Sequence, residues 1–234
     1  MTPPAEFKTI ADETFQAIFG RDCPYTVTEL REKFARDIQL PTKVQDSTTG
    51  EDTWTAMPNA EKYITDKNSS QRDEKVGWMQ PQQTLHGIKD ILKLWREINY
   101  ITTERAYNCE RVYASDPVYG SSDVYMCTNC NNCQKILYCD GDFEANHAIA
   151  CQRSGNLNYC IRVDDSNSCT NSYSVVCCSK ISNSLFIQDA SDLYECMFCS
   201  HISNRQFCIA NIQFEKEAYY QVKTEVIDWI LRQS

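Results

Sequence analysis

The chain has 234 residues, of which 42% are hydrophobic, and a formal net charge of −9 at pH 7. This charge argues against nucleic acid as a partner, because phosphate binding needs a basic face. No apolar run approaches the ~18 residues that cross a membrane, and the N-terminus lacks the basic and apolar regions of a signal peptide.

The first 40 residues predict a helical N-terminal segment, 1–40. Apolar residues recur at helical spacing up to Gly20, which is placed as a stop. A second helix is predicted from Thr26 to Ile38, with Thr26 as the N-cap and Glu29 completing a capping box.

Residues 41–81 are polar and irregular, and so long a segment without regular structure is uncommon inside a compact domain. We predict an extended arm whose large apolar side chains contact another surface. The candidate contact residues are Trp54, Met57, Tyr63 and Trp78. The alternative is a solvated linker.

Residues 82–99 form the clearest predicted helix, because their apolar side chains share one face and charged side chains occupy the other. The apolar face consists of Leu85, Ile88, Ile91, Leu92, Trp95 and Ile98. The helix leads directly into a cysteine-rich segment, so we expect residues 82–108 to cover the first coil of that segment. A matching helix over 215–232, in a C-terminal segment 213–234, is expected to cover its far end, because the open ends of repeat arrays expose apolar interior and strand edges.

The segment 109–212 carries two nested periods. Twelve of its thirteen cysteines share one phase of a three-residue period, and almost every other position in that phase is small or apolar. These cysteines are Cys109, Cys127, Cys130, Cys133, Cys139, Cys151, Cys160, Cys169, Cys178, Cys196, Cys199 and Cys208. Only Cys177 is out of phase. A narrow interior explains this restriction, because it has room only for small side chains.

The longer period is twelve residues, and one column of it is apolar or aromatic in all nine rows. The column consists of Tyr113, Tyr125, Leu137, Ile149, Ile161, Tyr173, Leu185, Met197 and Ile209. We therefore predict an α+β fold: a helical N-terminal region and a tight parallel β-solenoid of about nine turns, capped by a C-terminal helix. With coils about 4.8 Å apart, the solenoid is a rod roughly 40 Å long.

The apolar column is too large to stay exposed to water. Either the chain's own first hundred residues cover it, or another chain does. In the second case the column is an interaction ladder, along which the rod attaches to a partner.

The cysteines allow three interpretations. Disulfides are the first, but the cysteine spacings would pair too few of the cysteines for an oxidised framework. A zinc site is the second, with candidate ligands Cys127, Cys130, Cys133, Cys196, Cys199 and His201. We favour the third, in which Cys is a small buried hydrophobe that needs no cofactor and folds in a reducing cytoplasm.

The sequence offers no convincing catalytic group. The acidic residues of the solenoid scatter over several columns, whereas glycoside cleavage needs paired carboxylates. His86, His147 and His201 force no pairing with a nucleophile. The seven glycines form no phosphate-binding loop. We therefore expect a protein that is not an enzyme.

Two resemblances add to these expectations. The three-residue inward spacing within a twelve-residue coil resembles the β-solenoid of beetle antifreeze proteins, although the Thr-x-Thr rows of those proteins are missing here. The stretch NRQFCIANIQFEKEAY at 204–219 resembles the closing segment of an uncharacterised cysteine-rich family from bacteriophage and environmental bacteria, over roughly residues 95–230. The second resemblance implies a phage source.

Together these observations predict a non-enzymatic structural or attachment protein. We expect a bacteriophage virion component, such as a head decoration, neck or fibre-associated subunit, that folds in the host cytoplasm. Its partners are then other virion proteins or its own symmetry mates. The alternatives are an intracellular zinc-binding or redox protein, and a carbohydrate-binding spike that uses aromatics such as Tyr113 and Tyr125.

Overall fold

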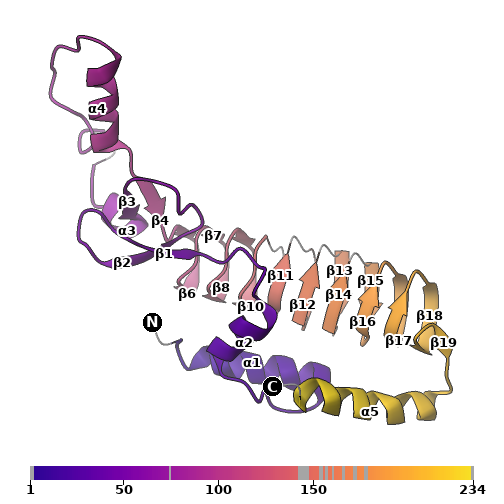
Figure 1. The fold of residues 1–234 in the computed structure, drawn as a ribbon. Coiled ribbons are helices and arrows are strands. Elements are labelled where there is room, and N and C mark those ends of the chain that lie inside the picture. The colour runs from indigo at the N-terminus through magenta and orange to yellow at the C-terminus, as the bar shows by residue number, and fades with distance from the viewer. Residues whose placement is uncertain are drawn as a thin grey trace.

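The computed structural model confirms the α+β class, with helices at both ends of the chain and a parallel β-solenoid between them (Figure 1). The structure describes residues 3–73, 75–141, 148–152, 155, 158–159, 161–164, 167–170, 173–176 and 179–232, without the side chains of 151–152, 163–164 and 167–169.

One face of the solenoid is a long parallel ladder. Its strands are β6 (Glu110–Tyr113), β8 (Ser122–Tyr125), β10 (Gln134–Leu137), β11 (Ile149–Gln152), β12 (Ile161–Asp164), β14 (Tyr173–Val176), β16 (Leu185–Gln188), β17 (Ser191–Ser200) and β18 (Ser203–Ile209). Each residue of the apolar column pairs with the residue twelve positions later, from Tyr113 in the first strand to Ile209 in the last. Each twelve-residue repeat therefore forms one coil of the solenoid.

Further strands, of two or four residues each, form the other sides of the coils. They are β5 (Ala106–Tyr107), β7 (Val118–Tyr119), β9 (Cys130–Asn131), β13 (Asn167–Thr170) and β15 (Ser179–Ser182). The solenoid has about seven turns of about twelve residues, slightly fewer than the nine rows of the sequence. It ends where β19 (Ile212–Gln213) turns back and pairs antiparallel with β18.

The three-residue period is the inner wall of the rod. The buried apolar side chains described in this interior are Val118, Val124, Cys127, Cys130, Cys133, Ile136, Cys139, Ala148, Val175, Ile181, Ile187, Ala190, Leu193, Cys196, Cys199 and Cys208. The residue before most inward positions has a left-handed backbone, with φ between 48° and 62° from Asn108 to Ala210. One such bend in every three residues lets the chain close into a narrow twelve-residue coil.

Three helices cover the side of the solenoid that carries the apolar column (Figure 1). They are α1 (Glu6–Phe19), α2 (Val27–Phe34) and α5 (Lys216–Arg232). Gly20, with φ 68°, ends α1, and Thr26 and Glu29 form the predicted capping box. The second helix ends at Phe34 and not at Ile38, although Ile38 is still buried.

Residues 41–81 are not an extended arm over their whole length. Strands β1 (Thr42–Gln45) and β2 (Asp52–Thr55) form an antiparallel hairpin, and β3 (Tyr63–Thr65) pairs in parallel with β4 (Ile101–Thr103). The short helix α3 (Asp66–Ser69) follows β3 directly. The strands have only three or four residues each, too few for a period of two to be recognised in the sequence.

A buried ion pair joins this small module to the first coil. The Asp116 carboxylate is fully buried and receives two hydrogen bonds from the Arg105 guanidinium, at 2.8 and 3.2 Å. The backbone N–H of Ala56, just after β2, donates to the same carboxylate at 3.1 Å. One side chain therefore fixes the hairpin, β4 and the solenoid relative to one another.

The sequence suggested that the helix over 82–99 covers the first coil. The structure shows otherwise, because helix α4 (Ile88–Ile98) does not lie on that coil. It projects away from the solenoid beyond the module of β1 to β4 (Figure 1), and none of its residues is buried. None of the described helices is long and apolar enough to cross a membrane.

Candidate functional site

The apolar column lies beneath the chain's own helices. Phe7 of α1 contacts the rings of Tyr113 and Tyr125, with centroid distances of 5.7 and 5.0 Å. Phe19 and Phe34 approach Tyr173 in the same way, at 5.4 and 6.1 Å.

The apolar column could be covered either by the chain's own N-terminal residues or by another chain, and the exposure of its residues decides between these two alternatives. The middle residues Leu137, Ile149, Ile161 and Met197 are all 0% exposed, and Leu185 is 1% exposed. The partly buried column residues Tyr113, Tyr173 and Ile209 pack against the same cluster. The column is therefore core and is not free to serve as an interaction ladder for another chain.

Polar contacts fix the helices in this position. The Tyr138 hydroxyl donates to the Val27 carbonyl of α2 at 2.6 Å. The Lys223 ammonium of α5 lies 2.6 Å from the Glu195 carboxylate, and both side chains are almost buried. The same cover removes Tyr125, which is 4% exposed, from any glycan-binding surface.

The described cysteines behave as interior side chains. Those at 127, 130, 133, 139, 196, 199 and 208 are buried, and their thiols donate mainly to nearby backbone carbonyls. The hydrogen bond between Cys196 and Cys199 lowers the pKa of Cys199 and raises the pKa of Cys196. Cys160, Cys177 and Cys178, the side chains of Cys151 and Cys169, and also His147 lie outside the described residues.

The candidate zinc ligands do not gather into one site. Within the part of the chain that the structure describes, no group of three or more His, Cys, Asp or Glu side chains is placed to hold a metal ion. The His201 side chain is 76% exposed and lies 3.8 Å from Asp189 on the outer surface, whereas Cys196 and Cys199 are in the interior.

The four predicted arm contacts have separate environments. Tyr63 is buried, and its hydroxyl accepts a hydrogen bond from the Ala60 N–H at 2.9 Å. Trp54 is half-buried against the helix-covered core, and Trp78 packs on Tyr100 at 5.8 Å. Met57 is 51% exposed. Three of the four therefore contact their own chain.

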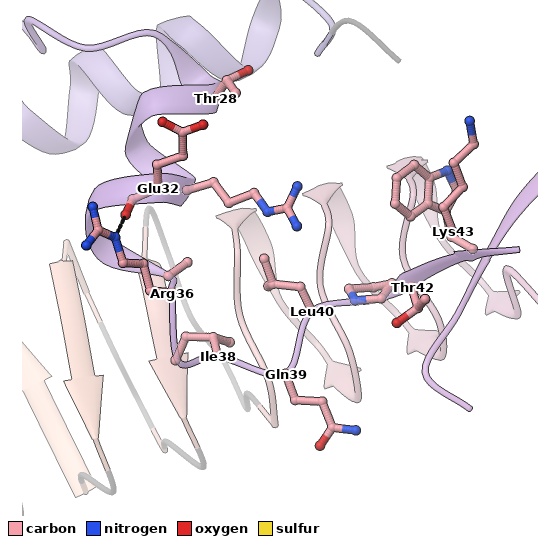
Figure 2. A pocket seen from close by; sticks show the side chains of 12 residues that line it. Thr28, Glu32, Arg36, Ile38, Gln39, Leu40, Thr42 and Lys43 are labelled. Atoms are coloured by element: carbon pink, nitrogen blue, oxygen red, sulfur yellow. Dashed lines mark hydrogen bonds between the residues drawn. The ribbon is translucent and has the colours of Figure 1, made fainter. Parts of the chain in front are cut away.

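A groove of about 740 Å³ lies between α2 and the β1–β2 hairpin (Figure 2). Its lining includes Arg31, Glu32, Arg36, Lys43 and Trp54. Two of its cations already have partners, because Arg36 donates to the Glu32 carbonyl and Lys43 lies 2.5 Å from Asp52. The groove is open to solvent, and Tyr219, the one described residue with a buried polar side-chain atom that lacks a hydrogen-bond partner, does not line it.

The strongest candidate site is the apolar face of α4. Ile88, Ile91, Leu92 and Trp95 are 65, 48, 50 and 53% exposed, and Leu85 before the helix is 45% exposed. Val76 and Met79 in the preceding loop are exposed as well, at 68 and 72%. Large apolar groups that stay together on a surface usually mark an interaction site. The sequence predicted this face but not its exposure.

No family model, curated protein or solved structure matches this chain significantly.

Proposed function

We propose that this chain is a non-enzymatic structural or attachment protein, and specifically a bacteriophage virion component such as a head decoration, neck or fibre-associated subunit. In this proposal the solenoid is a rigid body that displays its outer faces, and α4 anchors it to a neighbour.

The exposed apolar face of α4 is the observation that carries the proposal. A helix of this kind gains most of its stability from burying its apolar face, and the described part of this chain does not bury it. A neighbouring subunit supplies the missing cover. This favours assembly over a function that the chain performs alone.

The construction of the rod supports a static role. Its backbone ladder runs through all coils, one core fills the interior, and a second core lies between the coils and the three helices. Such a body resists bending, because closely packed interiors do not deform continuously. A rigid body suits a protein that holds a surface at a fixed distance.

The phage assignment rests on the resemblance of residues 204–219 to a phage and environmental cysteine-rich family. Buried cysteines whose thiols donate to backbone carbonyls, such as Cys127 and Cys199, fit synthesis in a reducing cytoplasm, as inside an infected cell. The zinc or redox alternative has less support because, among the described residues, no group of three or more candidate ligands is placed to hold a metal ion. The glycan-binding alternative has less support because Tyr113 and Tyr125 contact Phe7 of α1.

The direct experiment is to purify intact particles from the source of this chain on a density gradient and measure the chain by quantitative mass spectrometry. We expect a fixed copy number per particle, and we expect Trp95→Asp to remove the chain from particles while Lys93→Glu, on the opposite side of α4, does not. A chain that stays wholly in the unassembled fraction contradicts the proposal.

A further inference from the structure

Helix α4 carries its charges in a regular arrangement around the apolar face. At 3.6 residues per turn, Trp95 lies near the middle of this face, with Lys89 and Arg96 along one edge. Asp90 and Glu97 lie along the other edge. The face thus has one basic flank and one acidic flank, and the two flanks repeat at the same spacing of seven residues.

The charges on the two flanks favour a particular partner, a parallel copy of α4 itself. If copies of α4 surround a common axis in parallel, each apolar face points to the axis and the basic flank of one copy meets the acidic flank of the next. In such a bundle, equivalent residues of all copies lie at the same level along the axis. Arg96 of one copy is therefore offset from Glu97 of its neighbour by only the rise of one helical residue, about 1.5 Å. Lys89 and Asp90 match in the same way.

Antiparallel pairing lacks this match. A two-fold axis perpendicular to the helices places the basic flank against the partner's basic flank and the acidic flank against the acidic flank. Like charges in such positions are destabilising. A lipid surface also fits poorly, because the acidic flank would lie at the level of anionic headgroups.

We propose that α4 binds further copies of the same chain in a parallel, rotationally symmetric bundle. This inference rests on the proposed function, in which α4 is the anchor, and it identifies the neighbour that α4 binds as another copy of this chain. The apolar arc from Leu94 through Trp95 to Leu92 spans about 160°, wider than the narrow seam of a two-stranded coiled coil. The bundle therefore has three or more copies.

The present contacts of these charges do not prevent the bundle. Arg96 lies 3.9 Å from Glu61, and both side chains are at least 70% exposed, so the pair is easily exchanged. Asp90 accepts the His86 N–H through Oδ2 at 2.8 Å, a bond that holds the start of the helix. Helix α4 has three basic and two acidic side chains, so it does not share the negative excess of the whole chain.

The test is sedimentation equilibrium of the full chain, whose monomer mass is 27.0 kDa. We expect a mass at least three times that value. Arg96→Glu places like charges together in the parallel bundle and should weaken association roughly tenfold or more. Glu97→Arg should do the same, and the double variant Arg96→Glu/Glu97→Arg should restore association. Lys93→Glu, the same kind of change on the outer face, should leave the mass unchanged.

Each other result overturns the inference. A wild-type monomer or dimer excludes the bundle, and association strengthened by Arg96→Glu identifies antiparallel packing. Circular dichroism confirms that each variant is folded, as expected for exposed positions. The particle experiment can succeed while this one fails, which would show that α4 binds a different protein. The reverse result would show a self-associating protein that belongs to no particle.

Discussion

Left-handed backbone is the residue-scale feature that shapes the solenoid. Ordinary L-residues adopt positive φ at a cost of about 1–2 kcal/mol, and asparagine does so more readily. Asn108, Asn129, Asn132, Asn183 and Asn204 all occupy such positions, so the sequence contains a signal for them. The three-residue phase predicted which side chains point inward, but the left-handed turns could not be predicted from a phase of apolar residues.

A β-branched residue should not be tolerated at these turns. Lys180 is exposed and has φ 51°, and Ser179 beside it is exposed without a left-handed backbone. We predict that Lys180→Val lowers the free energy of unfolding by about 1–2 kcal/mol more than Ser179→Val does. Chemical denaturation of both variants measures the difference. Equal effects at the two positions would contradict the role of the turn.

Asp46 is a buried carboxylate that organises the module of β1 to β4. It accepts hydrogen bonds from the backbone N–H groups of Thr48 at 2.7 Å and Thr65 at 2.8 Å, and from the Asn68 amide at 2.8 Å. Burial alone would raise its pKa, but these hydrogen bonds outweigh burial and hold the pKa of Asp46 well below its ordinary value. The ionised form is therefore the one that stabilises the fold.

The pH dependence follows from the direction of this shift. A carboxylate with a lowered folded-state pKa contributes its stability above about pH 4 and loses it as the pH falls further. We predict that Asp46→Asn costs about 2 kcal/mol at pH 7, and that its stability falls less than that of the wild type between about pH 4 and pH 2. Denaturant titrations at both pH values measure this. Parallel losses in the two proteins would contradict the assignment.

At the scale of elements, the helices differ in what they cover. The apolar faces of α1, α2 and α5 pack on the solenoid, whereas the face of α4 stays exposed. Periodicity predicted that these helices exist and which face of each is apolar. Periodicity could not predict which surface packs on each apolar face, because the same pattern suits a helix that packs on its own chain and one that packs on a neighbouring chain.

Phe7 tests whether α1 is part of the solenoid core. Its ring is 0% exposed and contacts two tyrosines of the column. Phe7→Ala should lower the free energy of unfolding by about 3–5 kcal/mol, because it leaves a cavity between helix and coil. Gln16→Ala, at an exposed position of the same helix, should change it by about 0.5 kcal/mol or less. A small effect of Phe7→Ala would mean that α1 is only loosely attached.

At the scale of the whole molecule, the Arg105–Asp116 pair connects the projecting part to the rod. Removing one partner of a buried ion pair leaves an uncompensated charge, so Arg105→Ala should cost about 3–5 kcal/mol. Arg111→Ala removes the pair of a solvent-exposed guanidinium with Asp123 and should cost much less than Arg105→Ala. Faster hydrogen exchange at Ala56, whose amide donates to Asp116, would locate the effect at this joint. Equal losses in the two variants would contradict it.

The claim on which the rod depends is that its cysteines are packing side chains. One sample tests it most directly: metal analysis together with a thiol count on the purified full chain. We predict fourteen reactive thiols per chain in denaturant without reductant, matching the fourteen cysteines, and no stoichiometric metal. Zinc or iron at about one ion per chain, lost when Cys130 and Cys133 are replaced by serine, would contradict the packing role. Thiols missing in pairs would contradict it equally, as evidence for disulfides.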